Sequence, residues 1–160
     1  MKRWLLMILC LALLCAGCGK EAQTEDFRFI YREVEIGMNV EAGPVLYRLG
    51  EPMGVSQSPS CADAGMDTTY YHGGIYLTTS TVEGTERIAR AWFADDTVCT
   101  GEGLKIGDSR QRVEELYGPE GFREDGLWEA VRGNTRLIIT FGENMVDGII
   151  YEAVHLGKTC

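Results

Sequence analysis

Two similar segments decide the fold that the sequence predicts: Ile36-Gly37-Met38-Asn39 and, later in the chain, Ile106-Gly107-Asp108-Ser109. A short helix pattern follows each of them, Val45-x-x-x-Leu49-Gly50 after the first and Val113-x-x-x-Tyr117-Gly118 after the second. Asn39 and Ser109 are residue types that cap helix N-termini, with Asp108 as an alternative cap, and glycine commonly ends a helix. We therefore expect the same helix twice, the first copy being weakened by Gly43-Pro44.

A strand pattern with a period of two follows each predicted helix. In the first half, residues 70–72 and 75–79 flank Gly73-Gly74, which is a hairpin signal. In the second half, residues 127–131 and 136–141 flank a polar turn in the same way. A third strand is predicted in each half, at residues 88–93 and 146–151.

The predicted fold class is therefore α+β, with two tandem repeats of one helix and a three-stranded antiparallel sheet. Repeat one spans residues 34–97. Repeat two spans residues 98–160 and includes a connector at residues 98–103 and a C-terminal tail. We expect the helices to pack on one face of the sheets, which leaves the other face open.

Gly37-Met38-Asn39, with Val45 and Leu49-Gly50-Glu51-Pro52, resembles the helix motif of the SmpA/OmlA small lipoproteins. Two fused copies also resemble the β-lactamase inhibitor protein, and the resemblance covers roughly residues 34–154. It implies a three-stranded sheet after each helix. For function it implies either assistance in the assembly of outer-membrane β-barrel proteins or the binding of an enzyme on a concave sheet.

The N-terminus has the pattern of a bacterial signal peptide, residues 1–17: a basic start, the apolar run 4–14 and then small residues. The apolar run is shorter than the roughly 20 residues of a membrane-spanning helix. Leu14-Cys15-Ala16-Gly17-Cys18 resembles the lipobox of bacterial lipoproteins, whose final cysteine receives acyl chains such as palmitate. The resemblance implies lipid attachment at Cys18 and a tether through residue 33. It also implies an extracytoplasmic location, anchored at the cell membrane or the outer membrane.

The chain is acidic, with a formal net charge of −9 over 160 residues. Removal of the signal peptide, which contains Lys2 and Arg3 and no acid, makes it more acidic still. Such a surface repels nucleic acid and anionic lipid headgroups. We therefore expect no nucleic-acid partner, and we expect membrane attachment through the lipid rather than through a basic patch.

No motif for catalysis, metal or cofactor binding is present. The sequence has no Cys-x-x-Cys, no Gly-x-Ser-x-Gly and no phosphate-binding loop. His72 and His155 are the only histidines, and a structural zinc site needs four ligands. We expect His72, beside Gly73-Gly74, to be a solvated turn residue. The enzyme alternative rests on a lone acid pair, Glu129 and Asp147.

Four cysteines follow the signal peptide: Cys18, Cys61, Cys99 and Cys160. If Cys18 is acylated, at most one disulfide forms among the remaining three. Cys61 with Cys99 is the pairing we favour, because the two flank the first predicted sheet, and Cys160 is the alternative partner of Cys61. The sequence does not decide between them.

Aromatic residues on predicted strands form a candidate binding face: Tyr70, Tyr71, Tyr76, Trp92 and Trp128. Successive strand residues point to opposite faces, so Tyr70 and Tyr71 cannot both be covered by one helix layer. Exposed tyrosine and tryptophan are typical anchors of protein interfaces. The alternative is partial burial at a sheet edge.

These observations predict a lipid-anchored lipoprotein of the cell envelope that acts as a non-catalytic protein-binding or scaffold module, with an unknown protein or wall component as its partner. An inhibitor of a secreted enzyme is one alternative, and a hydrolase of envelope polymers is another. No cofactor is expected.

Overall fold

The computed structural model describes residues 25–60 and 65–154. The predicted signal peptide, Cys18, Cys61, His155 and Cys160 lie outside these residues, so the expectations about them are neither supported nor contradicted by the structure.

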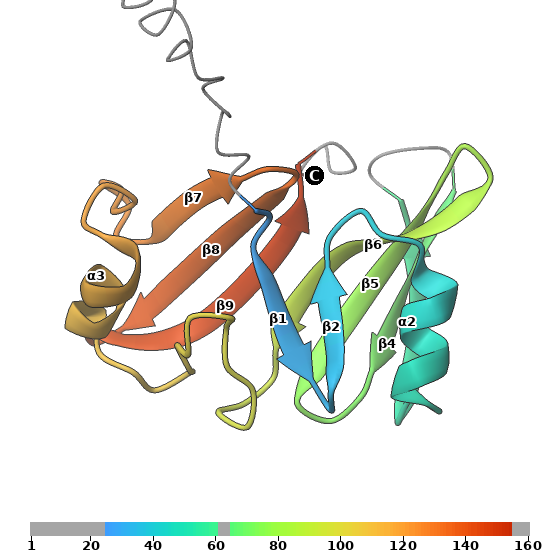
Figure 1. Ribbon diagram of the computed structural model, residues 1–160, viewed down its shortest axis with the longest axis horizontal. Helices are drawn as coiled ribbons and strands as arrows, with labels where there is room; N and C mark the ends of the chain where they lie inside the picture. Colours follow the sequence, from blue (N-terminus) through green and yellow to red (C-terminus); the bar gives the residue numbers. More distant parts are fainter. Residues whose placement is uncertain (1–24, 61–64, 155–160) are drawn as a thin grey trace, which may run out of the picture.

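The described chain forms nine strands and two helices, most of them in one antiparallel sheet (Figure 1). Their order is β1 (Arg28–Tyr31), β2 (Val34–Gly37), α2 (Ala42–Leu49), β3 (Gly54–Pro59), β4 (Met66–Tyr71), β5 (Ile75–Val82), β6 (Thr85–Phe93), α3 (Arg110–Tyr117), β7 (Trp128–Arg132), β8 (Thr135–Gly142) and β9 (Met145–Ala153).

The main sheet has seven strands in the order β3-β4-β5-β6-β9-β8-β7. Strands β6 and β9 join the two halves of the chain at its centre, through the pairs Arg90↔Glu152, Ala91↔Tyr151 and Trp92↔Ile150. The strands β1 and β2 form a separate two-stranded hairpin. Among the described residues, neither helix is long and apolar enough to cross a membrane.

This architecture corrects the predicted fold class. The single strands lie close to where their alternating patterns predicted them, but they do not form two tandem helix–sheet repeats. The chain forms one continuous seven-stranded sheet, to which β3 adds an unpredicted strand. The physical reason is that a strand's alternation shows which side chains are buried, and says nothing about which strand lies beside it.

The N-terminal hairpin is a second departure from the predicted organisation. Residues 28–31, which we expected in the tether, form β1, and Phe29 and Tyr31 point into the core. Phe29 is 1% exposed and contacts the rings of Phe93 and Tyr151 at centroid distances of 5.0 and 4.9 Å. The folded core therefore includes residues that precede the predicted first repeat.

Each helix ends at a glycine, as the sequence predicts. Gly50 has φ 78° and ψ −163°, and Gly118 has φ 84° and ψ 165°. The N-termini differ from each other. The Ser109 hydroxyl accepts a hydrogen bond from the Arg112 amide at 3.2 Å, which confirms it as a cap. Asn39 does not cap: α2 begins after Glu41, whose side chain makes no capping bond.

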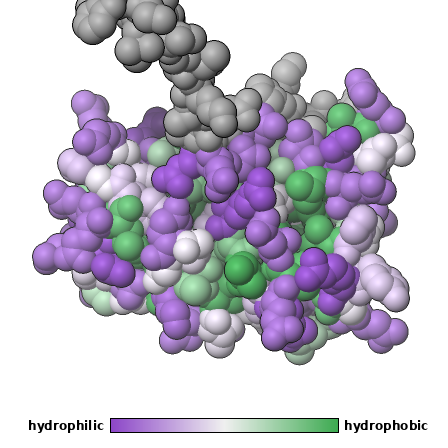
Figure 2. Space-filling model, viewed as in Figure 1, coloured by the Kyte–Doolittle hydropathy of each residue, from purple (hydrophilic) through white to green (hydrophobic). Residues whose placement is uncertain are grey.

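The helices and the β1–β2 hairpin lie on the same side of the main sheet (Figure 1). Their buried residues, among them Ile36, Val45 and Val113, form one core with the inward residues of the sheet, such as Leu77 and Leu137. Pro44 is tolerated because it lies in the first turn of α2, where its missing N–H has no helical acceptor. The outer surface of this layer is mostly hydrophilic (Figure 2). The opposite face of the sheet has no described element against it.

Candidate binding face

The uncovered face of the main sheet contains a row of five apolar side chains that crosses five strands. Each member is the direct cross-strand partner of the next: Tyr71, Tyr76, Trp92, Ile150 and Ile138. All five are half-buried. The rings of Tyr71 and Tyr76 stack at a centroid distance of 4.6 Å, and those of Tyr76 and Trp92 lie 4.9 Å apart. We call this set the apolar row.

A polar row lies beside the apolar row. Each of its members is on the same strand as a member of the apolar row, two residues away from it. Its members are Thr69, Thr78, Arg90, Glu152 and Arg136. The carboxylate of Glu152 lies 2.7 Å from Arg90 and 3.9 Å from Arg136, and the Thr69 and Thr78 hydroxyls are 2.9 Å apart. Glu152 has a side chain only 16% exposed, so both arginines are held over the sheet.

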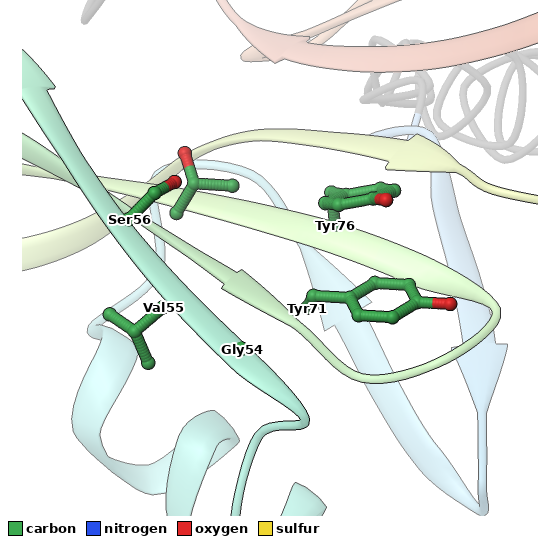
Figure 3. Close-up of a pocket in the computed structure, with 6 residues that line it drawn as sticks. Gly54, Val55, Ser56, Tyr71 and Tyr76 are labelled. Atoms are coloured by element: carbon green, nitrogen blue, oxygen red, sulfur yellow. The ribbon is translucent and has the colours of Figure 1, made fainter.

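A shallow depression of about 240 Å³ opens where the apolar row reaches the sheet edge (Figure 3). Its lining residues are Gly54, Val55, Ser56, Thr69, Tyr71 and Tyr76. Gly54 pairs with Tyr71 and has no side chain to cover that ring. The outer ring face of Tyr71 is therefore the exposed end of the stack.

The structure divides the five predicted aromatic residues between the two faces. Tyr71, Tyr76 and Trp92 lie together on the uncovered face. Tyr70 pairs with the buried Leu77 on the other face, and its hydroxyl donates to Glu86 at 3.2 Å. Burial and the negative charge of Glu86 raise the pKa of Tyr70.

Trp128 belongs to the core and not to the binding face. It is 2% exposed, its ring lies 5.0 Å from that of Tyr117, and its Nε1 donates to the Gly118 carbonyl at 3.0 Å. A ligand on the uncovered face therefore cannot contact it. Ile138 and Ile150 could not be recognised as part of this face from the sequence, because their place beside Trp92 depends on the β6–β9 pairing.

His72 is buried, contrary to the expectation of a solvated turn residue. It is 1% exposed, and neither ring nitrogen has a hydrogen-bond partner among the described residues. The Tyr31 hydroxyl donates to the His72 carbonyl at 2.5 Å and accepts from the Gly74 amide at 3.2 Å. Burial, together with the positive charge of Arg32, lowers the pKa of His72.

The acid pair considered for catalysis is occupied by internal contacts. Glu129 lies 3.0 Å from Arg123 and 3.4 Å from Arg136, and Asp147 accepts a hydrogen bond from Thr140 at 2.5 Å. Over residues 25–60 and 65–154, no three potential ligands are grouped so that they could hold a metal ion.

Cys99 is half-buried and is the one cysteine that the structure describes. Cys99 follows the C-terminal end of β6, and Ser60 follows the C-terminal end of β3. The register of the intervening strands places these two strand ends at opposite ends of the strands. This topology does not favour a Cys61–Cys99 bond. Because Cys61 lies outside the described residues, the pairing stays a prediction.

Comparison with solved structures shows a similar fold in a cysteine-rich secretory protein from Staphylococcus aureus. The TM-score is 0.51 at 12% sequence identity, over 72% of this chain and 43% of that one. An extracellular protein from Bacillus anthracis that contains an SCP domain gives a TM-score of 0.45, also at 12% identity, over 74% of this chain and 44% of the other. The chain spans less than half the length of either protein. No protein-family model and no curated protein matches the sequence.

These comparisons correct the family resemblance. The similar fold is that of a cysteine-rich secretory protein and not that of an SmpA/OmlA lipoprotein or of the β-lactamase inhibitor protein. The motif that suggested those families marks helix ends and a turn, which unrelated proteins share. The secretory nature of the staphylococcal protein agrees with the extracytoplasmic location predicted for this chain.

Proposed function

We propose that this chain is a lipid-anchored, extracytoplasmic binding module without catalytic activity, and that it holds a partner protein on the uncovered face of its sheet. The observation that supports this most strongly is the apolar row. Five adjacent half-exposed apolar side chains, three of them aromatic, lie on a sheet face that has no covering layer among the described residues.

A protein partner suits this face better than a wall polysaccharide. Sugars bind aromatic residues through ring faces, but the ring of Tyr76 lies between those of Tyr71 and Trp92, at centroid distances of 4.6 and 4.9 Å, so the depression exposes the outer face of one ring only, that of Tyr71. In the neighbouring polar row, Arg90, Glu152 and Arg136 alternate positive and negative charge, which can match opposite charges on a protein surface. Since an enzyme is one kind of partner protein, the inhibitor alternative falls within this proposal.

The geometry gives less support to a hydrolase. Catalytic carboxylates act from a concave site where they face a substrate. Here Glu129 lies between two arginines, and Asp147 is bonded to Thr140 on the next strand. The depression beside Tyr71 contains no carboxylate among its lining residues.

The test is partner capture with matched variants of the full chain. Trp92→Ala removes the centre of the apolar row. Tyr47→Ala is the control, because Tyr47 is 89% exposed on α2, on the covered side of the sheet. We expect at least one envelope protein to be captured by the wild type and by Tyr47→Ala, and to be lost with Trp92→Ala while that variant stays folded. Equal capture by all three proteins would refute the proposal.

A further inference from the structure

The outermost strand, β3, has one edge with no strand beside it among residues 25–60 and 65–154. The sheet ends at β3, which pairs only with β4, and all six residues Gly54–Pro59 are exposed. An edge strand presents backbone N–H and C=O groups to any extended chain that approaches. Natural proteins usually protect such edges with charged side chains, bulges or a covering segment.

The two ends of this sheet differ in their protection. At the far end, β7 contains Glu129 and Arg132, which form ion pairs with Arg123 and Glu102 at 3.0 Å each. The strand β3 contains no charged residue, and its register with β4 is continuous over six pairs. Pro59, at its C-terminal end, is its one protective feature. Most of the β3 edge is therefore open to pairing.

The depression on the uncovered face lies next to this edge, over β3 and β4. A Cβ atom added at Gly54 would find its nearest neighbour, Cβ of Tyr71, at 4.0 Å, so the space above Gly54 is unfilled. Met53 and Val55, on either side of Gly54, are 71% and 58% exposed. A glycine in a strand often marks a place where another chain approaches closely, and an aromatic side chain on the neighbouring strand can cover it.

We propose that β3 pairs with an extended segment of a partner protein, which adds an eighth strand to the sheet and places an aromatic side chain across Gly54 onto the ring of Tyr71. The added side chain would place one more ring beside those of Tyr71, Tyr76 and Trp92. This inference rests on the proposed function, because it specifies the class of partner segment that the uncovered face receives.

The net charge of the chain also restricts the charge of the partner segment. The chain has a net charge of −9, so an acidic segment is repelled, while β3 itself offers no charge to pair with. The segment is therefore neutral or basic, extended, and alternates side chains toward the two faces of the sheet. Only the side chain opposite Gly54 needs to be aromatic.

The probe is a phage-displayed library of random dodecapeptides, selected on the immobilised full chain. Peptides that bind are synthesised, and their affinity is measured for the wild type, Gly54→Val and Gly65→Val. Gly54→Val fills the depression without a backbone clash. Gly65→Val is the matched control, since Gly65 is exposed with nothing within 4 Å of an added Cβ.

We expect the selected peptides to share an aromatic residue and to bind Gly54→Val at least about tenfold more weakly than the wild type, with no change for Gly65→Val. Bound peptide should also slow amide hydrogen exchange within Gly54–Pro59. An absence of binding peptides, equal affinity for Gly54→Val, or unchanged exchange in β3 would overturn the inference. So would a chain that dimerises through β3 and takes no peptide.

Trp92→Ala separates this inference from the proposed function. If the captured partner requires Trp92 but is indifferent to Gly54→Val, the edge pairing is refuted and the face remains the binding surface. If the partner is indifferent to both substitutions, both proposals are refuted. Unfolding midpoints of each variant show whether a loss of binding reflects a loss of fold.

Discussion

At the scale of single residues, His72 is the side chain whose surroundings differ most from what its sequence position indicates. Gly73-Gly74 beside it predicted a solvated turn, but Tyr31 from the N-terminal hairpin contacts the backbone on both sides of the turn. The imidazole is buried without a hydrogen-bond partner among the described residues, which favours its neutral form.

This burial predicts that acid destabilises the fold through His72. The pKa of His72 in the folded state lies below its unfolded value of about 6.5, so protons bind the unfolded chain more tightly. The free energy of unfolding that neutral His72 contributes is fully present above about pH 6.5. It is lost as the pH falls below that value, by at most about 1.4 kcal/mol per pH unit. Urea unfolding at pH 7.5 and pH 5.5 measures the loss.

The His72→Phe variant should lose less stability than the wild type between these two pH values. His155→Gln is the control for the second histidine and should behave like the wild type. A wild-type stability that is constant from pH 7.5 to 5.5 would show that His72 is not held neutral by burial.

Gly50 gives a second prediction at this scale. Its φ of 78° with ψ of −163° lies in a region that is essentially restricted to glycine. An added Cβ at Gly50 would touch nothing, so the cost of Gly50→Ala is purely conformational, about 1–3 kcal/mol in the free energy of unfolding. Gly43→Ala, at the exposed start of α2, should instead be neutral or slightly stabilising. Equal unfolding midpoints for the two variants would refute this backbone conformation.

At the scale of elements, the helix α3 is the one whose start the sequence defines best. Ser109 caps it, while α2 has no side-chain cap at Glu41. We expect Ser109→Ala to lower the free energy of unfolding by about 1 kcal/mol. Glu41→Ala should change it much less, and thermal unfolding of both variants checks the difference. A cost for Glu41→Ala as large as that for Ser109→Ala would contradict the cap assignment.

The elements themselves were largely predictable because each rests on local signals. Gly50 and Gly118 end the helices, and Gly73-Gly74 joins β4 to β5. The strand β3 was missed because Gly54–Pro59 contains glycine, serine and proline and has no apolar alternation. The alternation rule also predicted that Tyr70 and Tyr71 face opposite sides, although it could not say which of them is covered.

At the scale of the whole molecule, the sequence could not show how the two halves meet. The β6–β9 pairing joins residues about 60 positions apart, and no local signal specifies it. The same pairing places Ile150 and Ile138 beside Trp92 and so completes the apolar row. Trp128 was placed on the candidate binding face because it is an aromatic residue on a predicted strand, and the pattern of that strand does not show which of its faces is covered.

Membrane attachment is also a property of the whole molecule. We expect Cys18→Ala to move the protein from the membrane fraction to the soluble extracytoplasmic fraction, because a chain with a net charge of −9 is repelled by an anionic lipid surface. Fractionation followed by immunoblotting measures the shift. If the variant stays in the membrane fraction, Cys18 is not the anchor.

The central claim is that the uncovered sheet face is the binding surface, and site-specific photocrosslinking tests it most directly. A benzoylphenylalanine at position 78 replaces Thr78 in the polar row, and one at position 47 replaces the exposed Tyr47 on the covered side. We expect position 78 to crosslink to one envelope protein and position 47 not to crosslink to it. Crosslinking of the bound partner from position 47, with none from position 78, would contradict the central claim.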